Sequence, residues 1–295
     1  MSDGLLAEIG QRLARAAQRD PRTSIEGLLL SRHETSEPDY QLTEPLFILM
    51  AQGRKRLYVG PDAIEYGTGE CLVVTANLPL SGHFVDATPE RPALAVALTL
   101  RPSDIAALLP KLAGGRRIES STESAVGTHI ADARLLDAIA RLLRLLDHPA
   151  DAGVLAPLVQ REILWRLLTG PSGEKIARIG LADSSLVHVG RAIAWIRENF
   201  AEPIPIRDLA AIAGMSTSTF HRHFRVVTGL TPLQFQKLLQ LQEARSLLLA
   251  GTHDVTGVAH LIGYNSPTQF NREYRRQFGS PPGRDAGRLR NAVRA

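Results

Sequence analysis

Residues 206–229 read IRDLAAIAGMSTSTFHRHFRVVTG, and residues 255–279 read VTGVAHLIGYNSPTQFNREYRRQFG. The two stretches repeat one pattern: an apolar residue followed by Ala, then a Gly, a Ser, and two aromatic residues four positions apart. One extra residue enters the second stretch between its Gly and its Ser. A repeat of this detail indicates that the chain contains the same structural unit twice.

Each repeated position has a mechanical role in a pair of helices joined by a tight turn. Ala210 is small enough for a second helix to cross closely, and Gly214 can adopt the left-handed conformation that ends the first helix. Ser216 is placed to cap the second helix. Phe220 and Phe224 lie on one face of that helix, which predicts the buried side. The equivalents in the second copy are Ala259, Gly263, Ser266, Phe270 and Tyr274.

The opposite face of each second helix carries polar and basic side chains. They are Ser218, His221, Arg222 and Arg225 in the first copy, and Thr268, Asn271, Arg272 and Arg275 in the second. Such donors and acceptors suit base edges and phosphates in the major groove of DNA. The pattern therefore predicts two helix-turn-helix motifs, at about residues 207–228 and 256–278.

Residues 233–250 join the two copies and contain neither Gly nor Pro. As a helix this segment spans about 27 Å, at about 1.5 Å per residue. We expect it to hold the two reading helices about one DNA turn apart, or about 34 Å, on one face of the duplex.

Three signatures carry a resemblance to a known family: DLAAIAGMSTSTFHRHFRVVTGLTP, the Ala-Arg of Glu243-Ala244-Arg245, and VAHLIGYNSPTQFNREYRRQFGSPP. With them, residues 190–285 resemble the DNA-binding domain of the AraC/XylS family of bacterial transcription regulators. The resemblance implies base reading by Thr217, Ser218, His221 and Arg222, and then by Pro267, Thr268, Asn271 and Arg272. Because Pro267 has no side-chain donor, we expect the second helix to read fewer bases. Arg225, Arg275 and Arg276 suit phosphate contacts, with plain solvation as the alternative.

The first third of the chain has a different pattern. Residues 1–20 are typical of an amphipathic helix, and short apolar runs separated by turn residues between 25 and 100 predict strands of a small β-barrel or jelly roll. The sequence FILMAQGRKRLYVG…EYGTGECLVVTANLPLSG resembles the cupin-like N-terminal domain of one branch of AraC-type regulators, over about residues 25–170.

Helical periodicity returns after the predicted barrel, at residues 103–112, 131–147 and 154–169. The predicted fold is therefore α+β and multidomain. A cupin-like barrel with flanking helices occupies residues 1–170, and an all-α domain with two helix-turn-helix motifs joined by a long helix occupies residues 186–288. Residues 171–185 contain Pro, Gly and polar residues and predict the connector.

The barrel interior is the default place for a small effector. Most of the residues that strand alternation places inside the barrel could also be ordinary core. The predicted lining is Phe47, Leu49, Tyr58, Tyr66, Leu72, Val74, Asn77, Phe84 and Leu98. His33 and His83 stand apart from each other and from any suitably spaced Glu, so we expect neither a metal nor another cofactor. Cys71 is expected to be a buried, inert thiol, with a redox or electrophile sensor as the alternative.

Charge is distributed unevenly along the chain. Residues 203–295 hold 12 Lys and Arg against 5 Asp and Glu, whereas the whole chain holds 34 against 30, so the basic excess lies with the predicted DNA-reading motifs. A single Cys fits a reducing cytoplasm. The N-terminal residues do not have the pattern of a signal peptide, and no run reaches the length of a membrane span.

These observations together predict a cytoplasmic, sequence-specific DNA-binding regulator. The partners we expect are double-stranded DNA and an unknown small-molecule effector, and family resemblance adds activation through RNA polymerase and dimerisation through helices at 131–169. No catalytic constellation is visible, so an enzyme fused to a DNA-targeting module is disfavoured. A constitutive or repressing DNA binder with a structural N-terminal domain stays open as the alternative.

Overall fold

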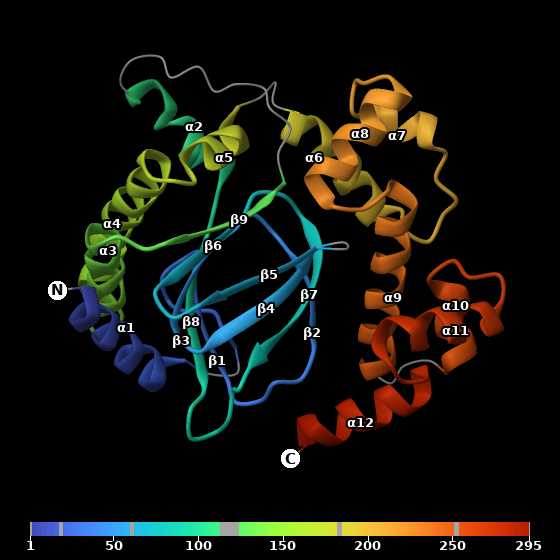
Figure 1. The fold of residues 1–295 in the computed structure, drawn as a ribbon, viewed down its shortest axis with the longest axis horizontal. Helices are drawn as coiled ribbons and strands as arrows, with labels where there is room; N and C mark the ends of the chain where they lie inside the picture. Colours follow the sequence, from blue (N-terminus) through green and yellow to red (C-terminus); the bar gives the residue numbers. More distant parts are fainter. Residues whose placement is uncertain are drawn as a thin grey trace. The chain divides into compact units, whose positions relative to one another are not determined.

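The computed structural model describes residues 2–17, 20–59, 62–112, 124–181, 185–250 and 254–294. The chain divides into two compact units. The N-terminal unit comprises Met1–His188 with Val226–Gly229, and the C-terminal unit comprises Val189–Arg225 with Leu230–Ala295. Figure 1 labels the helices and strands of the two units.

The N-terminal unit is built on two antiparallel sheets. One has the order β1-β8-β3-β6-β9 and the other the order β2-β7-β4-β5. The strands are β1 (Leu28–His33), β2 (Asp39–Thr43), β3 (Leu46–Gln52), β4 (Arg54–Val59), β5 (Asp62–Gly67), β6 (Glu70–Val74), β7 (Leu78–Val85), β8 (Ala93–Thr99) and β9 (Val126–Ile130).

Side-chain alternation decides which residues form the core between the sheets. In β4, Leu57 and Val59 are buried whereas Arg54, Arg56 and Tyr58 are exposed. The central strands β3, β6 and β8 are buried almost throughout, because a helical layer covers their second face.

The helices of this unit pack on one another, and the first of them lies against β1, β3 and β8 of the five-stranded sheet (Figure 1). They are α1 (Ser2–Ala16), α2 (Pro102–Ala106), α3 (Ala133–Arg144), α4 (Pro149–Thr169) and α5 (Gly173–Ala177). Leu135, Leu136, Ile139, Leu142 and Leu143 of α3 are buried, as the amphipathic stripe predicts. Asp132 caps α3 by accepting a hydrogen bond from the Leu135 amide at 2.7 Å.

Three parts of the sequence-based expectation differ from the structure. The strands β2 and β9 do not coincide with the apolar runs that predict strands, since DYQLT and VGTHI are too polar to give a clear strand signal. The expected connector at 171–185 is helical over 173–180, where α5 and a 3-10 turn bury Ile176, Ala177 and Ile179. Composition alone could not reveal that these few apolar residues are core.

The C-terminal unit is helical over its described residues, apart from short turns. Its elements are α6 (Ser185–Glu198), of which residues 189–198 belong to this unit, then α7 (Ile206–Ile212), α8 (Thr217–Thr228), α9 (Pro232–Ala250), α10 (Val255–Leu261), α11 (Pro267–Phe278) and α12 (Pro282–Arg294). The pairs α7–α8 and α10–α11 are the two predicted helix-turn-helix motifs, and α9 is the predicted joining helix (Figure 1). The predicted fold class is confirmed.

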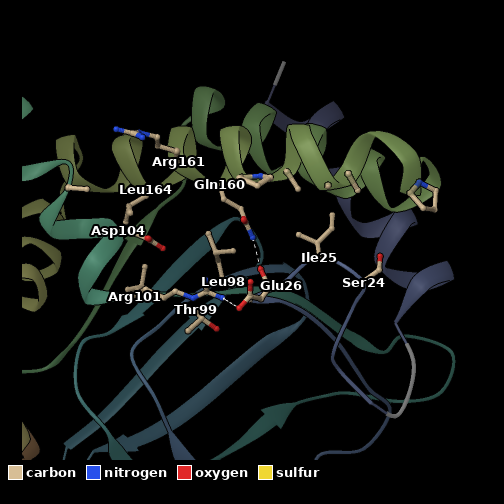
Figure 2. A pocket seen from close by; sticks show the side chains of 18 residues that line it. Ser24, Ile25, Glu26, Leu98, Thr99, Arg101, Asp104, Gln160, Arg161 and Leu164 are labelled. Atoms are coloured by element: carbon tan, nitrogen blue, oxygen red, sulfur yellow. Dashed lines mark hydrogen bonds and ion pairs between the residues drawn. The ribbon is translucent and has the colours of Figure 1, made fainter.

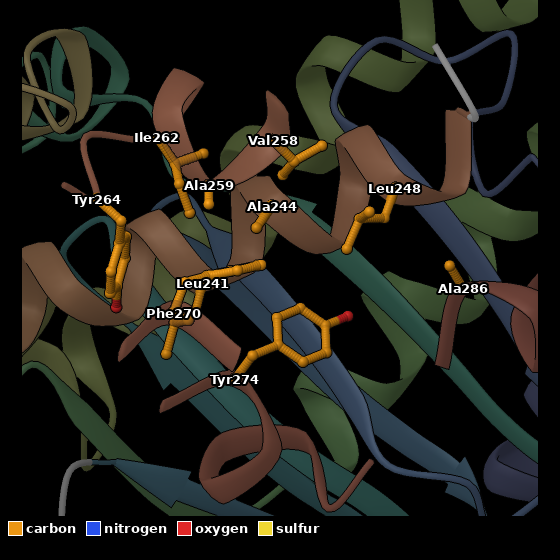
Figure 3. Close-up of a cluster of buried hydrophobic side chains, with 10 residues drawn as sticks. All are labelled: Leu241, Ala244, Leu248, Val258, Ala259, Ile262, Tyr264, Phe270, Tyr274 and Ala286. Carbon is orange, nitrogen blue, oxygen red and sulfur yellow. The ribbon is translucent and has the colours of Figure 1, made fainter. Parts of the chain in front are cut away.

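The helix α9 contributes to the cores of both motifs. Its Phe235 ring meets Phe224 of α8 edge-on, with ring centroids 5.4 Å apart. Further along α9, Leu241, Ala244 and Leu248 enter a second cluster (Figure 3). Its other members are Val258, Ala259, Ile262, Tyr264, Phe270, Tyr274 and Ala286. The buried residues of α9 therefore point to more than one side, which links the two motifs.

The turns of the two motifs require glycine. Gly214 and Gly263 have φ angles of 63° and 85°, the left-handed region that L side chains rarely adopt. A Cβ on Gly263 would also lie 2.0 Å from the carbonyl oxygen of Ala201. The repeated glycine is thus fixed by backbone conformation in both copies and by a close contact in the second.

A buried carboxylate ties three helices of the C-terminal unit together. Asp285 of α12 has no exposed side-chain surface. It accepts hydrogen bonds from Arg245 of α9 at 2.9 Å, from the Tyr274 hydroxyl of α11 at 3.0 Å, and from Arg288 at 3.1 Å. Burial by itself raises the pKa of Asp285, but these hydrogen bonds outweigh it and the pKa is lowered.

We predict that Asp285→Asn destabilises the C-terminal unit by about 3–5 kcal/mol, because it leaves the Arg245 guanidinium buried without its counter-charge. Since the folded-state pKa is lowered, the stabilisation is complete above the unfolded-state pKa of about 3.9 and is lost as the pH falls through the folded value. Urea unfolding followed by Trp195 fluorescence, in a Trp165→Phe background, measures both effects.

The matched control is Asp208→Asn, which removes a carboxylate of the same unit whose ion pair with Arg207 is at the surface. It should cost far less stability, because solvent screens an exposed ion pair. Equal losses for the two variants would contradict the role given to Asp285.

Candidate functional site

The helix α8 presents one buried aromatic face and one exposed polar face. Phe220 and Phe224 are fully buried, with ring centroids 5.3 Å apart. On the other side all five sequence-predicted residues are exposed. They are Thr217, Ser218, His221, Arg222 and Arg225. Because the aromatic pair fixes the rotation of the helix, the polar side chains share a surface that faces solvent.

The helix α11 repeats this arrangement. Ser266 caps it by accepting from the Gln269 amide at 3.3 Å, and Pro267 occupies its first turn, half-buried. Thr268, Asn271, Arg272 and Arg275 are exposed. The Asn271 side-chain amide donates to the Pro267 carbonyl at 3.0 Å, so part of its hydrogen-bonding capacity is used within the helix.

A basic hollow of about 630 Å³ lies beside α11. It is lined by Asn271, Arg272, Arg275, Arg276 and Pro281. Three guanidinium groups with no acidic residue in the lining make a surface that attracts phosphate. Arg275 and Arg276, both expected to contact phosphate, lie in this hollow together with Arg272.

The partly buried side of α11 carries a polar contact of its own. The Tyr264 hydroxyl donates to Glu273 at 2.6 Å, and the ammonium of Lys237 lies 4.0 Å from the centre of the Tyr264 ring. Burial alone would raise the pKa of Glu273, but hydrogen bonds from Tyr264 and Gln269 outweigh it and lower the pKa. These contacts hold α11 against α9 through an ionised carboxylate.

Most residues expected to line an effector site in the barrel are buried. Phe47, Leu49, Tyr66, Leu72, Val74 and Phe84 are each less than 5% exposed. Asn77 is half-buried after β6. Tyr58 is 38% exposed and was assigned to the wrong face, because its neighbours Leu57 and Val59 take the inward positions of β4.

The side chains of Lys55 and Asp39 form an ion pair inside the N-terminal unit that the sequence did not predict. Lys55, between the exposed Arg54 and Arg56, bonds Asp39 of β2 at 3.0 Å and lies 4.7 Å from the centre of the Phe84 ring. His33 stacks on the same ring at 4.2 Å. The pKa of His33 is lowered mainly by burial and further by the Lys55 charge. Only the strand register could show that these residues converge.

Further expectations from the sequence concern the thiol of Cys71, metal binding and membrane spans. Cys71 is fully buried, and burial is the main cause that raises the pKa of its thiol. Among the described residues no group of three His, Cys, Asp or Glu side chains is placed to hold a metal ion. No helix in the described ranges is long and apolar enough to cross a membrane.

A pocket of about 640 Å³ lies between α4 and the end of β8 (Figure 2). Leu98 is the one proposed effector residue in its lining. Ile25, Leu100, Ala156 and Leu164 provide further buried apolar surface, and Glu26, Arg101, Asp104 and Gln160 provide polar groups. This site could not be predicted from sequence patterns, because its residues come from three separate segments.

Two family models match this chain. The AraC-type transcriptional regulator N-terminus matches residues 24–175, and a helix-turn-helix domain matches residues 209–287. The chain belongs to the AraC family of transcriptional regulators, as its signatures predicted, and its C-terminal unit contains the DNA-binding helix-turn-helix domain of that family.

Curated relatives include the HTH-type transcriptional activator RhaS of Salmonella paratyphi A, 31% identical over 160 residues, and RhaS of Salmonella arizonae, 31% identical over 159 residues. Each match covers 54% of this chain and 56% of the relative, so it spans about half the length of these proteins.

Solved structures of ToxT from Vibrio cholerae show the same fold. An apo form gives a TM-score of 0.56 at 9% identity, covering 90% of this chain and 98% of that one. A form bound to an unsaturated fatty acid gives a TM-score of 0.57 at 11% identity, covering 90% of this chain and 96% of that one.

We predict that Arg222→Ala weakens binding to a specific DNA site by about 1–3 kcal/mol, because a base-reading guanidinium makes bidentate bonds that no other side chain there replaces. Arg225→Ala should weaken binding to all DNA sequences alike and reduce the slope of log affinity against log salt concentration by about one. Fluorescence anisotropy with specific and scrambled duplexes separates the two effects.

Arg191→Ala is the matched control, since Arg191 is an exposed arginine on α6 and lies on neither reading helix. It should leave site preference unchanged. If Arg222→Ala lowered only non-specific binding, its assignment to base reading would be wrong.

Proposed function

We propose that the protein is a ligand-responsive transcriptional activator that recognises one double-stranded DNA site with both α8 and α11. The observation that carries this proposal is the pair of exposed polar faces within one compact unit, each fixed by a buried aromatic pair. Thr217, Ser218, His221 and Arg222 read bases. Thr268, Asn271 and Arg272 read fewer of them, and Arg225 and Arg275 contact phosphates.

Activation through RNA polymerase, action in the cytoplasm and the absence of catalytic activity are parts of the same proposal. Family membership supports them, together with the name of RhaS as an activator. Response to a ligand is supported by the ligand-bound form of ToxT, a protein of the same fold. A ligand can act only by favouring one arrangement of the protein over another.

Footprinting upstream of the protein's own gene and of adjacent genes, across a salt series, tests the proposal. We expect protection of two major-groove segments one turn apart on one face of the duplex, with a preference that survives moderate salt. Uniform protection that salt erases, in the presence and absence of cell extract as a source of effector, would contradict sequence-specific regulation.

We also propose that two copies associate through α4. Val154, Leu155 and Leu158 are 69%, 43% and 61% exposed, and helical spacing places them together on the side of α4 opposite its buried Ala156 and Leu167. An apolar surface of this kind on a helix is typical of an interaction site.

Leu158→Asp is expected to convert a dimer into a monomer in sedimentation equilibrium, because the charge would have to be buried in the interface. The variant should fold normally, since Leu158 is exposed. Leu233→Asp on α9 replaces another leucine that is 60% exposed and serves as control. A wild-type protein that stays monomeric at high concentration would rule out this interface.

A further inference from the structure

The pocket between α4 and the end of β8 has a shape and a lining that suit a small molecule. Its volume of about 640 Å³ falls within the usual range for ligand sites. Residues 149, 152, 153, 156 and 157 on α4 are Pro, Ala or Gly, so the helix leaves open space beside the sheet. Leu98 and Leu100 of the sheet side are buried and supply an apolar floor.

The chain itself places a carboxylate in this pocket. Arg101 binds an oxygen of Glu26 at 2.6 Å, and Gln160 of α4 donates to the Glu26 carbonyl oxygen at 2.8 Å (Figure 2). The Glu26 side chain is 83% exposed and that of Arg101 is 42% exposed. An exposed ion pair of this kind contributes little stability, so another carboxylate can replace Glu26 on Arg101 at small cost.

The remaining charges narrow the class of ligand. A guanidinium binds a carboxylate through two parallel hydrogen bonds, which makes Arg101 a suitable partner for a single carboxylate head group. Asp104 and Arg161 also line the pocket, so the lining holds two carboxylates and two guanidinium groups. A single negative charge is enough to take the place of Glu26 on Arg101, whereas a phosphate monoester brings a second charge close to Glu26 and Asp104. The apolar floor and the small residues of α4 suit a compact apolar body.

We propose that this pocket is the effector site and that it binds a monocarboxylic acid with a compact apolar body, whose carboxylate takes the place of Glu26 on Arg101. The assignment of an effector rests on the proposed function. The ligand would lie against α4, the helix whose opposite side carries Val154 and Leu158. A shift of α4 on ligand binding would therefore also move the surface proposed for dimerisation.

Isothermal titration of the full-length protein with 3-phenylpropanoate tests the site. The matched neutral probe is 3-phenylpropanol and the matched dianion is phenyl phosphate. We expect the carboxylate to bind with measurable affinity, and the other two probes to bind at least about tenfold more weakly, because only the carboxylate makes a charge-assisted pair with Arg101 at no added repulsion.

Three variants locate the binding. Arg101→Gln should weaken it by about tenfold or more, and Glu26→Gln should strengthen it about two- to fivefold by removing the internal competitor. Gly153→Phe should abolish it by filling the pocket, and it should fold, because nothing lies within 4 Å of a Cβ at this position. Lys55→Gln, which changes the ion pair inside the barrel, should leave the affinity unchanged.

Several results would overturn the proposal: no binding of the carboxylate at millimolar concentration, equal binding of the alcohol, or binding lost in Lys55→Gln and kept in Arg101→Gln. Footprinting with and without the bound carboxylate separates this proposal from the broader one. Binding in the pocket with unchanged DNA protection would support the binding site and contradict a ligand-responsive regulator. Specific DNA protection by a protein that binds no carboxylate would contradict the binding site and leave the proposed DNA recognition supported.

Discussion

The placement of the proposed DNA-reading surface depends on one helix that contributes to two hydrophobic cores. Phe235 of α9 packs on Phe224 of the first motif, while Leu241, Ala244 and Leu248 enter the core of the second. The 19 residues of α9 span about 28 Å at about 1.5 Å per residue. Because buried contacts at both ends fix its rotation, the directions in which α8 and α11 present their polar faces are not independent.

The polar contacts around the second motif reinforce this constraint. Asp285 connects α9, α11 and α12, and Glu273 holds α11 to Tyr264 and Lys237. Buried carboxylates tolerate few alternative geometries, since each hydrogen bond lost leaves a charge without compensation. The second reading helix is therefore positioned by directional bonds as well as by packing, while no equivalent buried carboxylate is seen among the described residues around α8.

The sequence predicted those elements whose signal is local. Gly214 and Gly263, the capping serines and the aromatic pairs each report a backbone conformation or a helix face, so both motifs and α9 could be placed to within a few residues. The amphipathic stripe of α3 was equally clear. These features also carried the family resemblance, which the family models confirmed.

What the sequence could not reveal depends on contacts between distant segments. The polar strands β2 and β9 form because neighbouring strands offer them hydrogen bonds, and Tyr58 takes the outward side because of the register of β4. Ile176 and Ile179 are core although their surroundings resemble a linker. The pocket at Arg101 joins residues near 25, near 100 and on α4, a juxtaposition that no periodicity encodes.

The central claim is that α9 holds the two reading helices at one fixed spacing, and changing the DNA tests it most directly. Once the protected site is known, 5 base pairs inserted between its two segments turn one of them to the opposite face of the duplex. The account predicts that affinity falls to that of a duplex carrying the first segment alone. Unchanged affinity for the lengthened site would show that the two motifs move independently, and would contradict the role given to α9.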